Sequence, residues 1–194
     1  MNISFTANKV LYDTEFLQLK ETQAPNGTPW VYAHRPNAKN VVVIAPVIHN
    51  EHGDSIVFLE TRRPPLYAEG KAQTCIELPA GLVGDETKGE TTRQAIRKEL
   101  LEETGYKANK ITISAKTVAS SSGCTSETST IAIADIFKDK IFKKPITDFG
   151  IIIDIHKIPL KKVESWLKLQ QKNGKAISSQ ALAGLYFVLS RIKK

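Results

Sequence analysis

Three glutamates, Glu99, Glu102 and Glu103, lie within five residues of one another and could bind a divalent cation. On a helix, residues three and four positions apart share a face, so the three carboxylates would form one cluster. Like charges at this spacing repel, and a hard cation such as Mg²⁺, which prefers oxygen ligands, would offset the repulsion. A solvated acidic helix face has the same pattern, and the three glutamates alone favour that simpler explanation.

The residues around the glutamates change this judgement. Gly84 is followed six positions later by Glu90, and Glu90 eight positions later by Lys98. The complete series is Gly84, Glu90, Lys98, Glu99, Leu100, Glu102, Glu103, Gly105 and Tyr106. It resembles the Nudix box, the signature of hydrolases that act on a nucleoside diphosphate linked to another moiety. The one departure is Lys98, which stands where the box has arginine.

The resemblance implies a metal site. Glu99 and Glu103 would be the main ligands, with Glu102 assisting, and the ion would be Mg²⁺, with Mn²⁺ as the alternative. Glu90 and Lys98 would hold the loop and the carboxylates in place. Because lysine cannot contact a carboxylate with two prongs as arginine does, the affinity for metal could be reduced, although we expect function to survive.

Residues 77–81 resemble the ADP-ribose pyrophosphatase branch of this family. In that branch the carbonyl of the residue matching Ala80 is a metal ligand, and the following glycine permits a close backbone approach. If Gly81 is the glycine of the box, the loop to Glu90 is three residues too long; if Gly84 is, the spacing fits but the turn is displaced. We favour Ala80 and Gly81 in the turn, with an insertion around residues 84–88. Glu77, which opens this segment, is expected at the substrate.

Three further stretches resemble the same branch. Arg63, in residues 61–66, matches an arginine that reaches the diphosphate, which a guanidinium can grip at two oxygens. Glu127, in residues 121–127, would lie near the terminal ribose or the metals. Trp30 would stack on adenine, although packing within the N-terminal segment or a dimer interface is an equal alternative.

The general base is expected in a late loop, residues 145–150. Asp148 is the carboxylate available there and could accept a proton if it lies within hydrogen-bond reach. It could equally be a turn residue ahead of Gly150. Asp154 follows within a predicted strand, and the sequence does not fix the face to which it points.

The predicted elements favour an α+β fold, an α/β/α sandwich with a mixed sheet. Residues 9–22 and 30–34 indicate strands of a β-meander, separated by a turn at residues 25–27. Further strands are expected at residues 40–49, 55–60, 75–78, 111–118, 130–137 and 151–158, with a loop at 62–73. Helices are expected at about 91–104, at 159–171, and after Ser178 or Ser179. We expect residues 1–38 to form an arm exchanged across a homodimer, ahead of a Nudix domain at 39–194.

Composition agrees with this interpretation. The chain has 194 residues, 41% hydrophobic and 24% charged, as in ordinary globular proteins. No apolar run reaches the ~20 residues of a membrane span, and the N-terminus lacks a secretory pattern. We therefore expect a cytoplasmic protein without membrane contact, whose Cys75 and Cys124 are reduced thiols.

The net charge of +7 comes largely from lysines after residue 137. These lysines fall on predicted amphipathic helices without interleaved aromatic residues, so a solvated helix face is favoured over nucleic-acid binding. A positive field would also help to gather an anionic substrate.

The predicted reaction is the hydrolysis of ADP-ribose, or a related ADP-sugar, to AMP and a sugar phosphate, ribose 5-phosphate for ADP-ribose. Two alternatives remain open. GDP-mannose, a dinucleotide or NADH could be the substrate, because loop contacts decide substrate choice. The second alternative is a Nudix-like module that binds a nucleotide sugar without cutting it. Lys98 and the sparse late loop favour this alternative.

Overall fold

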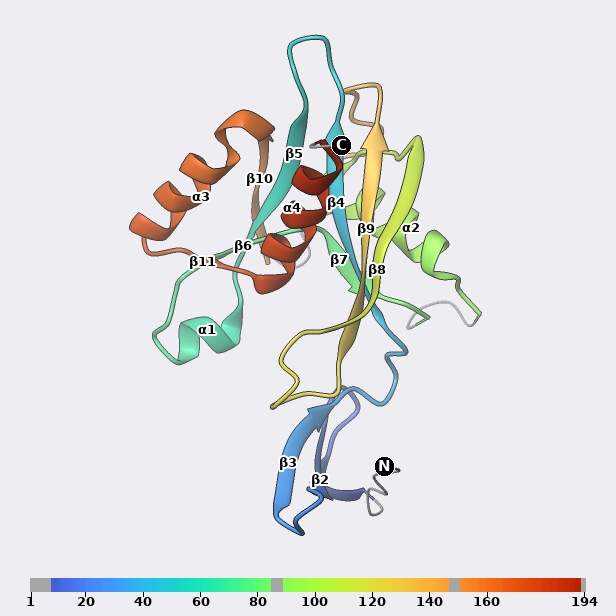
Figure 1. Ribbon diagram of the computed structural model, residues 1–194, viewed down its shortest axis with the longest axis vertical. Helices are drawn as coiled ribbons and strands as arrows, with labels where there is room; N and C mark the ends of the chain where they lie inside the picture. The colour runs from blue at the N-terminus through green and yellow to red at the C-terminus, as the bar shows by residue number, and fades with distance from the viewer. Residues whose placement is uncertain (1–7, 85–88, 147–150, 193–194) are drawn as a thin grey trace.

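The computed structural model describes residues 8–84, 89–146 and 151–192. Its main body is a mixed eight-stranded sheet between helices, below which a small separate sheet projects as an arm (Figure 1). The strands of the main sheet are β4 (Val41–Ile48), β5 (Ser55–Thr61), β6 (Cys75–Glu77), β7 (Ala80–Leu82), β8 (Lys110–Ala119), β9 (Thr128–Ile136), β10 (Ile152–Pro159) and β11 (Ala176–Ile177). The helices are α1 (Pro64–Ala68), α2 (Thr92–Thr104), the 3₁₀ turn η2 (Leu160–Lys162), α3 (Val163–Lys172) and α4 (Ser179–Ile192).

The central strand β4 shows how the sheet is covered on both faces. All eight of its residues are buried, and alternate side chains point to opposite faces of a strand. Val43 and Ala45 pack into a cluster that includes residues of α3 and α4. Val42 and Ile44 pack into a second cluster, with Ile96 and other residues of α2. The predicted sandwich of helices around a mixed sheet is confirmed.

The sheet opens between β4 and β5. These strands pair only through Val47 with Ile56 and Ile48 with Ser55. Beyond that point β5 continues with β6, and β4 continues with β7. The link between β6 and β7 therefore crosses the opening, and the residues 77–80 lie where the two halves of the sheet separate.

Helix α2 lies against this opening, and its ends follow from its sequence. Thr91 caps the N-terminus: its hydroxyl accepts the Gln94 amide, while the Gln94 side chain accepts the Thr91 amide. Ala95, Ile96 and Leu100 are buried against the sheet. Gly105 ends the helix with a φ of 75°, a left-handed conformation that glycine adopts without strain. The helix predicted at residues 91–104 is confirmed.

The arm is a three-stranded antiparallel sheet of β1 (Lys9–Asp13), β2 (Gln18–Gln23) and β3 (Pro29–His34). It joins the body through Ala33, whose amide donates to Cys124 O (2.8 Å) and whose carbonyl accepts the Ser126 amide (3.1 Å). The prediction of one continuous strand over 9–22 was wrong. Thr14 makes a tight turn there, because its side-chain oxygen accepts the Leu17 amide at 2.9 Å.

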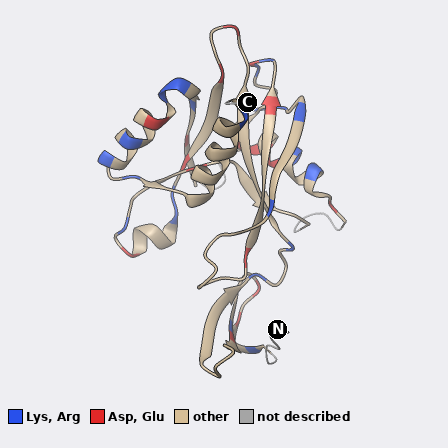
Figure 2. Cartoon of the chain, viewed as in Figure 1, with Lys and Arg blue, Asp and Glu red and all other residues tan. Residues whose placement is uncertain are grey.

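Two further expectations need correction. The predicted loop at 62–73 contains the short helix α1, whose first residue, Pro64, has the fixed φ that suits a helix start. The lysines of residues 138–144 lie in irregular chain instead of a helix. The lysines of α3 do spread along an exposed helix face, as expected (Figure 2). None of the described helices combines the length and hydropathy that a bilayer crossing requires.

Candidate metal and diphosphate site

Two glutamates of α2 meet the backbone of β7 at the opening of the sheet. The amide of Ala80 donates a hydrogen bond of 2.9 Å to Glu103 Oε2. A side-chain carbon built on Gly81 would lie 2.1 Å from the carboxylate carbon of Glu99. Glycine is therefore required at position 81 for Glu99 to occupy its place beside the strand.

The electrostatics of this pair favour a cation. Burial, together with the nearby charges of Glu99 and Glu77, raises the pKa of Glu103 to about 8, although the Ala80 amide and Arg63 act in the opposite direction. The carboxylates are thus close enough to destabilise one another's charge. A cation between them would remove this penalty.

An arginine and a third glutamate border the two α2 carboxylates. Arg63 donates to Glu77 Oε2 from Nε (2.8 Å), and its terminal nitrogen lies 2.6 Å from the same oxygen. Burial would lower the pKa of Arg63, but Glu77, with Glu103, raises it overall. Thr61 donates to Glu77 Oε2 as well, at 2.9 Å. Both partners bind one carboxylate oxygen, which fixes Glu77 at the end of β6.

The other residues of the box hold this arrangement together. Glu90 accepts the Gly84 amide at 3.0 Å, a contact between the residues after β7 and those before α2. Lys98 Nζ lies 3.5 Å from Glu99 Oε1, so the lysine contacts the carboxylate with a single ammonium. Gly81 and Gly84 therefore have separate parts: Gly81 makes the close approach to Glu99, while Gly84 has the loop contact to Glu90.

The residues present fit a divalent cation that keeps some of its own waters. Within the described parts of the chain, no three His, Cys, Asp or Glu side chains are gathered as a ready metal cage. Mg²⁺ does not need one, because it is commonly bound by one or two carboxylates plus water and phosphate oxygens. Glu99 and Glu103 supply such a pair. Glu102 lies on the same helix, and its backbone carbonyl accepts the Ile146 amide at 2.8 Å.

Trp30 and Glu127 have their described contacts elsewhere, at the junction of arm and body. Trp30 donates from its indole nitrogen to Gly123 O at 2.9 Å and is 49% exposed. Glu127 pairs with Arg35 at 3.0 Å, at the junction of arm and body. Asp148 lies outside the described residues.

Two residues that position the site were not predicted from the sequence. Thr61 is buried and contacts Glu77, as described above; a polar residue at the end of an apolar strand was a usable signal. Gly184 of α4 lies under Leu78, where an added side-chain carbon would come 2.3 Å from Leu78 Cδ1. It lets α4 approach the segment that carries Glu77 and Ala80, and no local pattern marks that contact.

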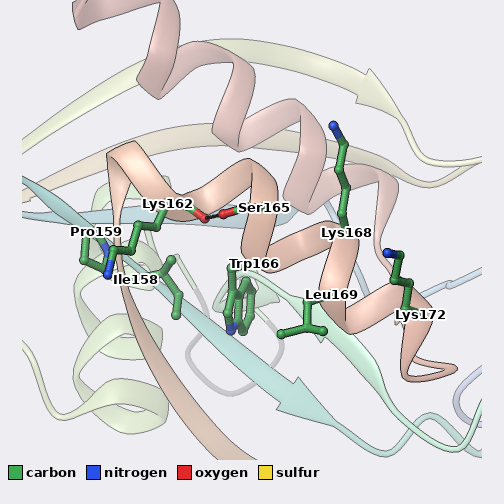
Figure 3. Close-up of a pocket in the computed structure, with 8 residues that line it drawn as sticks. All are labelled: Ile158, Pro159, Lys162, Ser165, Trp166, Lys168, Leu169 and Lys172. Carbon is green, nitrogen blue, oxygen red and sulfur yellow. Dashed lines mark hydrogen bonds between the residues drawn. The ribbon is translucent and has the colours of Figure 1, made fainter.

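A cavity of about 560 Å³ lies elsewhere, against α3 (Figure 3). Its floor is apolar and includes Trp166 and Leu169, and lysines, among them Lys162 and Lys172, border it. Its lining residues carry no carboxylate or imidazole, so this cavity has no groups to bind a metal ion.

Comparisons with known proteins indicate the family of the chain. A family model of the NUDIX domain matches residues 38–142. Over 65 residues the chain is 38% identical to "Putative nudix hydrolase 2" of Caenorhabditis elegans, covering 34% of this chain and 28% of that protein. The match thus spans less than a third of the length of this curated relative.

Two solved structures have a similar fold. A structure described as an ADP compounds hydrolase aligns with a TM-score of 0.65 and 17% identity, over 98% of this chain and 94% of that chain. The NUDIX domain of Shewanella oneidensis NrtR, complexed with ADP ribose, aligns with a TM-score of 0.55 and 15% identity, over 78% and 86% of the two chains. At these identities the likeness is one of fold.

Proposed function

The chain belongs to the Nudix family, and we propose that it hydrolyses the diphosphate bond of a nucleoside diphosphate sugar with the help of a divalent cation. The observation that carries the proposal is the placement of Glu103. Its carboxylate is held by the Ala80 amide at 2.9 Å, and burial together with the charge of Glu99 raises its pKa. A partly buried pair of like charges costs free energy unless a cation is bound. A diphosphate is the substrate that brings matching oxygen ligands.

Each residue of the site has a part in this proposal. Glu99 and Glu103 would hold the cation, Mg²⁺ or in its place Mn²⁺, with Glu102 assisting from the same helix and the Ala80 carbonyl as a further ligand. When bound, the cation supplies charge neutralisation for the diphosphate and makes water a better nucleophile. Arg63 would turn from Glu77 to a phosphate oxygen, since its side chain is 47% exposed and can reach outward. Asp148 remains the proposed general base.

ADP-ribose is the first candidate substrate, with AMP and ribose 5-phosphate as products. Support comes from the ADP ribose bound by the NrtR domain and from the description of the other structural neighbour as an ADP compounds hydrolase. Trp30, half exposed on the arm, would contact the adenine, and Glu127 the terminal ribose.

We propose that two copies of the chain associate through the arm, residues 1–38. Every residue of β1 is exposed, which leaves apolar side chains without cover. Several apolar residues of the arm are more than two fifths exposed, among them Val10, Tyr12, Phe16, Leu17 and Val31. An apolar surface of this kind is typical of a protein interface.

The test is to measure nucleoside monophosphate release from ADP-ribose, other ADP-sugars, GDP-mannose, a dinucleotide and NADH, with and without Mg²⁺. We expect Mg²⁺-dependent AMP release from ADP-ribose, abolished by Glu103→Gln. Glu164→Gln is the matched control, because Glu164 lies on α3 with an 82% exposed side chain and should not affect turnover.

The other outcomes separate the alternatives. GMP release from GDP-mannose alone, or cleavage of NADH or a dinucleotide alone, would assign a different substrate to the same site. Binding of ADP-ribose without product, by the same residues, would show a binding module in place of an enzyme. Asp148→Asn with unchanged turnover would remove Asp148 as the base.

A further inference from the structure

Residues 137–146, here called the basic segment, leave β9 and run along the end of α2 without regular structure. Two backbone hydrogen bonds attach them: the Phe142 amide donates to Gly105 O at 2.9 Å, and the Ile146 amide donates to Glu102 O at 2.8 Å. Gly105 permits this approach, since a side-chain carbon there would lie 2.3 Å from Lys143 O. The basic segment is therefore fixed to the helix that carries the proposed metal ligands.

Large apolar side chains of the basic segment are exposed. Phe137 is 58% exposed, Ile141 49%, and Phe142 and Ile146 46% each. These four residues lie within ten positions, so the basic segment exposes more apolar surface than an isolated surface residue does, which favours an interaction site.

Lysines alternate with these apolar residues. Lys138, Lys140, Lys143 and Lys144 are all exposed. The one acidic residue of the basic segment, Asp139, is paired with Lys157 at 2.6 Å and also accepts the Tyr106 hydroxyl at 2.9 Å, so it does not offset these charges.

The pattern of apolar and basic residues matches an anionic lipid surface. Lysine side chains are attracted to acidic headgroups, while aliphatic and aromatic side chains enter the boundary between headgroups and acyl chains. A single-stranded nucleic acid would instead need free aromatic faces for base stacking. Two of the four apolar residues are isoleucines, which have no such face. The Phe142 ring already has Lys107 Nζ at 4.9 Å and Lys140 Nζ at 5.4 Å from its centroid.

We propose that the basic segment binds the surface of membranes that contain anionic lipids, which departs from the expectation of no membrane contact. The chain would lie on such a surface without crossing it, and the end of α2 would face the headgroups. This interaction is independent of the proposed hydrolysis, because none of its apolar or lysine side chains takes part in the site at Glu103.

The experiment is cosedimentation of the full chain with vesicles of pure phosphatidylcholine or of phosphatidylcholine with about a third phosphatidylserine. We expect binding to the anionic vesicles alone, weakened by added salt. Lys143→Glu with Lys144→Glu should weaken partitioning at least roughly tenfold, since each lysine near the surface contributes to the attraction. Ile141→Ser should weaken it severalfold at constant charge. Thermal unfolding of each variant checks that it is folded.

The matched control is Lys162→Glu with Lys172→Glu, the same charge change placed at the end of η2 and the end of α3 (Figure 3). It should keep most of the binding. The proposal is overturned if anionic vesicles do not sediment the chain, if both double variants lose binding equally, or if Ile141→Ser has no effect. Tight binding of a single-stranded oligonucleotide without vesicle binding would overturn it in favour of a nucleic-acid partner.

Discussion

Gly81 and Glu99 are in such close contact that a side chain at position 81 would displace the Glu99 carboxylate: an added side-chain carbon would lie 2.1 Å from the Glu99 carboxylate carbon. In Gly81→Ala the flexible end of Glu99 must move, while the backbone can stay. We therefore expect little change in stability but a fall in turnover on the order of 10²-fold, the scale reported for an ångström of misplacement. Urea unfolding and kcat/KM with Mg²⁺ measure the two effects. A large loss of stability with normal turnover of the folded fraction would contradict this.

At Gly184, by contrast, a substitution should act mainly on the stability of the fold. Alanine gains about 1 kcal/mol over glycine inside a helix, but its methyl group would press on Leu78 Cδ1 at 2.3 Å. Overpacking of this kind costs about 1–3 kcal/mol, so Gly184→Ala should lower the free energy of unfolding. In a Leu78→Ala background the same change should become neutral or stabilising. Equal effects in the two backgrounds, measured by urea unfolding, would show that the two residues are not coupled.

Gly81 and Gly184 illustrate which features of the site could be predicted from the sequence and which could not. The spacing of Glu90, Glu99 and Glu103 predicts the helix and its carboxylates, because helical periodicity is local. The burial of every residue of β4 likewise follows from its run of apolar residues. The contact of Gly184 with Leu78 joins residues 106 positions apart, and only the folded chain brings them together.

Two other features of the structure were also not predicted from the sequence. The pairing of Arg63 with Glu77 depends on β5 and β6 being neighbours at the opening of the sheet, which residue spacing does not encode. The turn at Thr14 was missed because it contains neither glycine nor proline, the residues that usually mark turns.

A partly buried ion pair at the far end of β9 should make stability depend on pH. Arg191 donates two hydrogen bonds to Asp135, and His49 lies 2.7 Å from the same carboxylate. Burial alone would raise the pKa of Asp135, but these partners lower it below its ordinary 3.8. A lowered carboxyl pKa stabilises the fold above about pH 4, and the contribution is lost as pH falls through the folded value.

Asp135→Asn should therefore cost about 2–3 kcal/mol at pH 7, the scale of hydrogen bonds to a charged group. Its free energy of unfolding should also vary less between pH 5 and pH 2.5 than that of the wild type. Urea unfolding across this range is the measurement. Parallel pH profiles for the two proteins would show that Asp135 is not responsible.

Tyr12 allows a controlled test of the proposed dimer. It lies on the arm and is 67% exposed, while Tyr186 lies on α4 and is 65% exposed. If two copies cover the arm, Tyr12→Asp buries a charge and should shift the chain to a monomer, whereas Tyr186→Asp should not. Sedimentation equilibrium gives the mass of each variant. A monomeric wild type, or dimers of all three proteins, would contradict assembly through this part of the arm.

The central claim is that Glu99 and Glu103, held at Ala80 and Gly81, bind a divalent cation. Calorimetric titration of Mg²⁺, repeated with Mn²⁺, into the wild type, Glu103→Gln and Glu164→Gln tests it most directly. We predict saturable binding to the wild type and to Glu164→Gln, and binding at least roughly tenfold weaker to Glu103→Gln, which loses a charged ligand. Equal affinity of all three proteins for the cation would contradict the account.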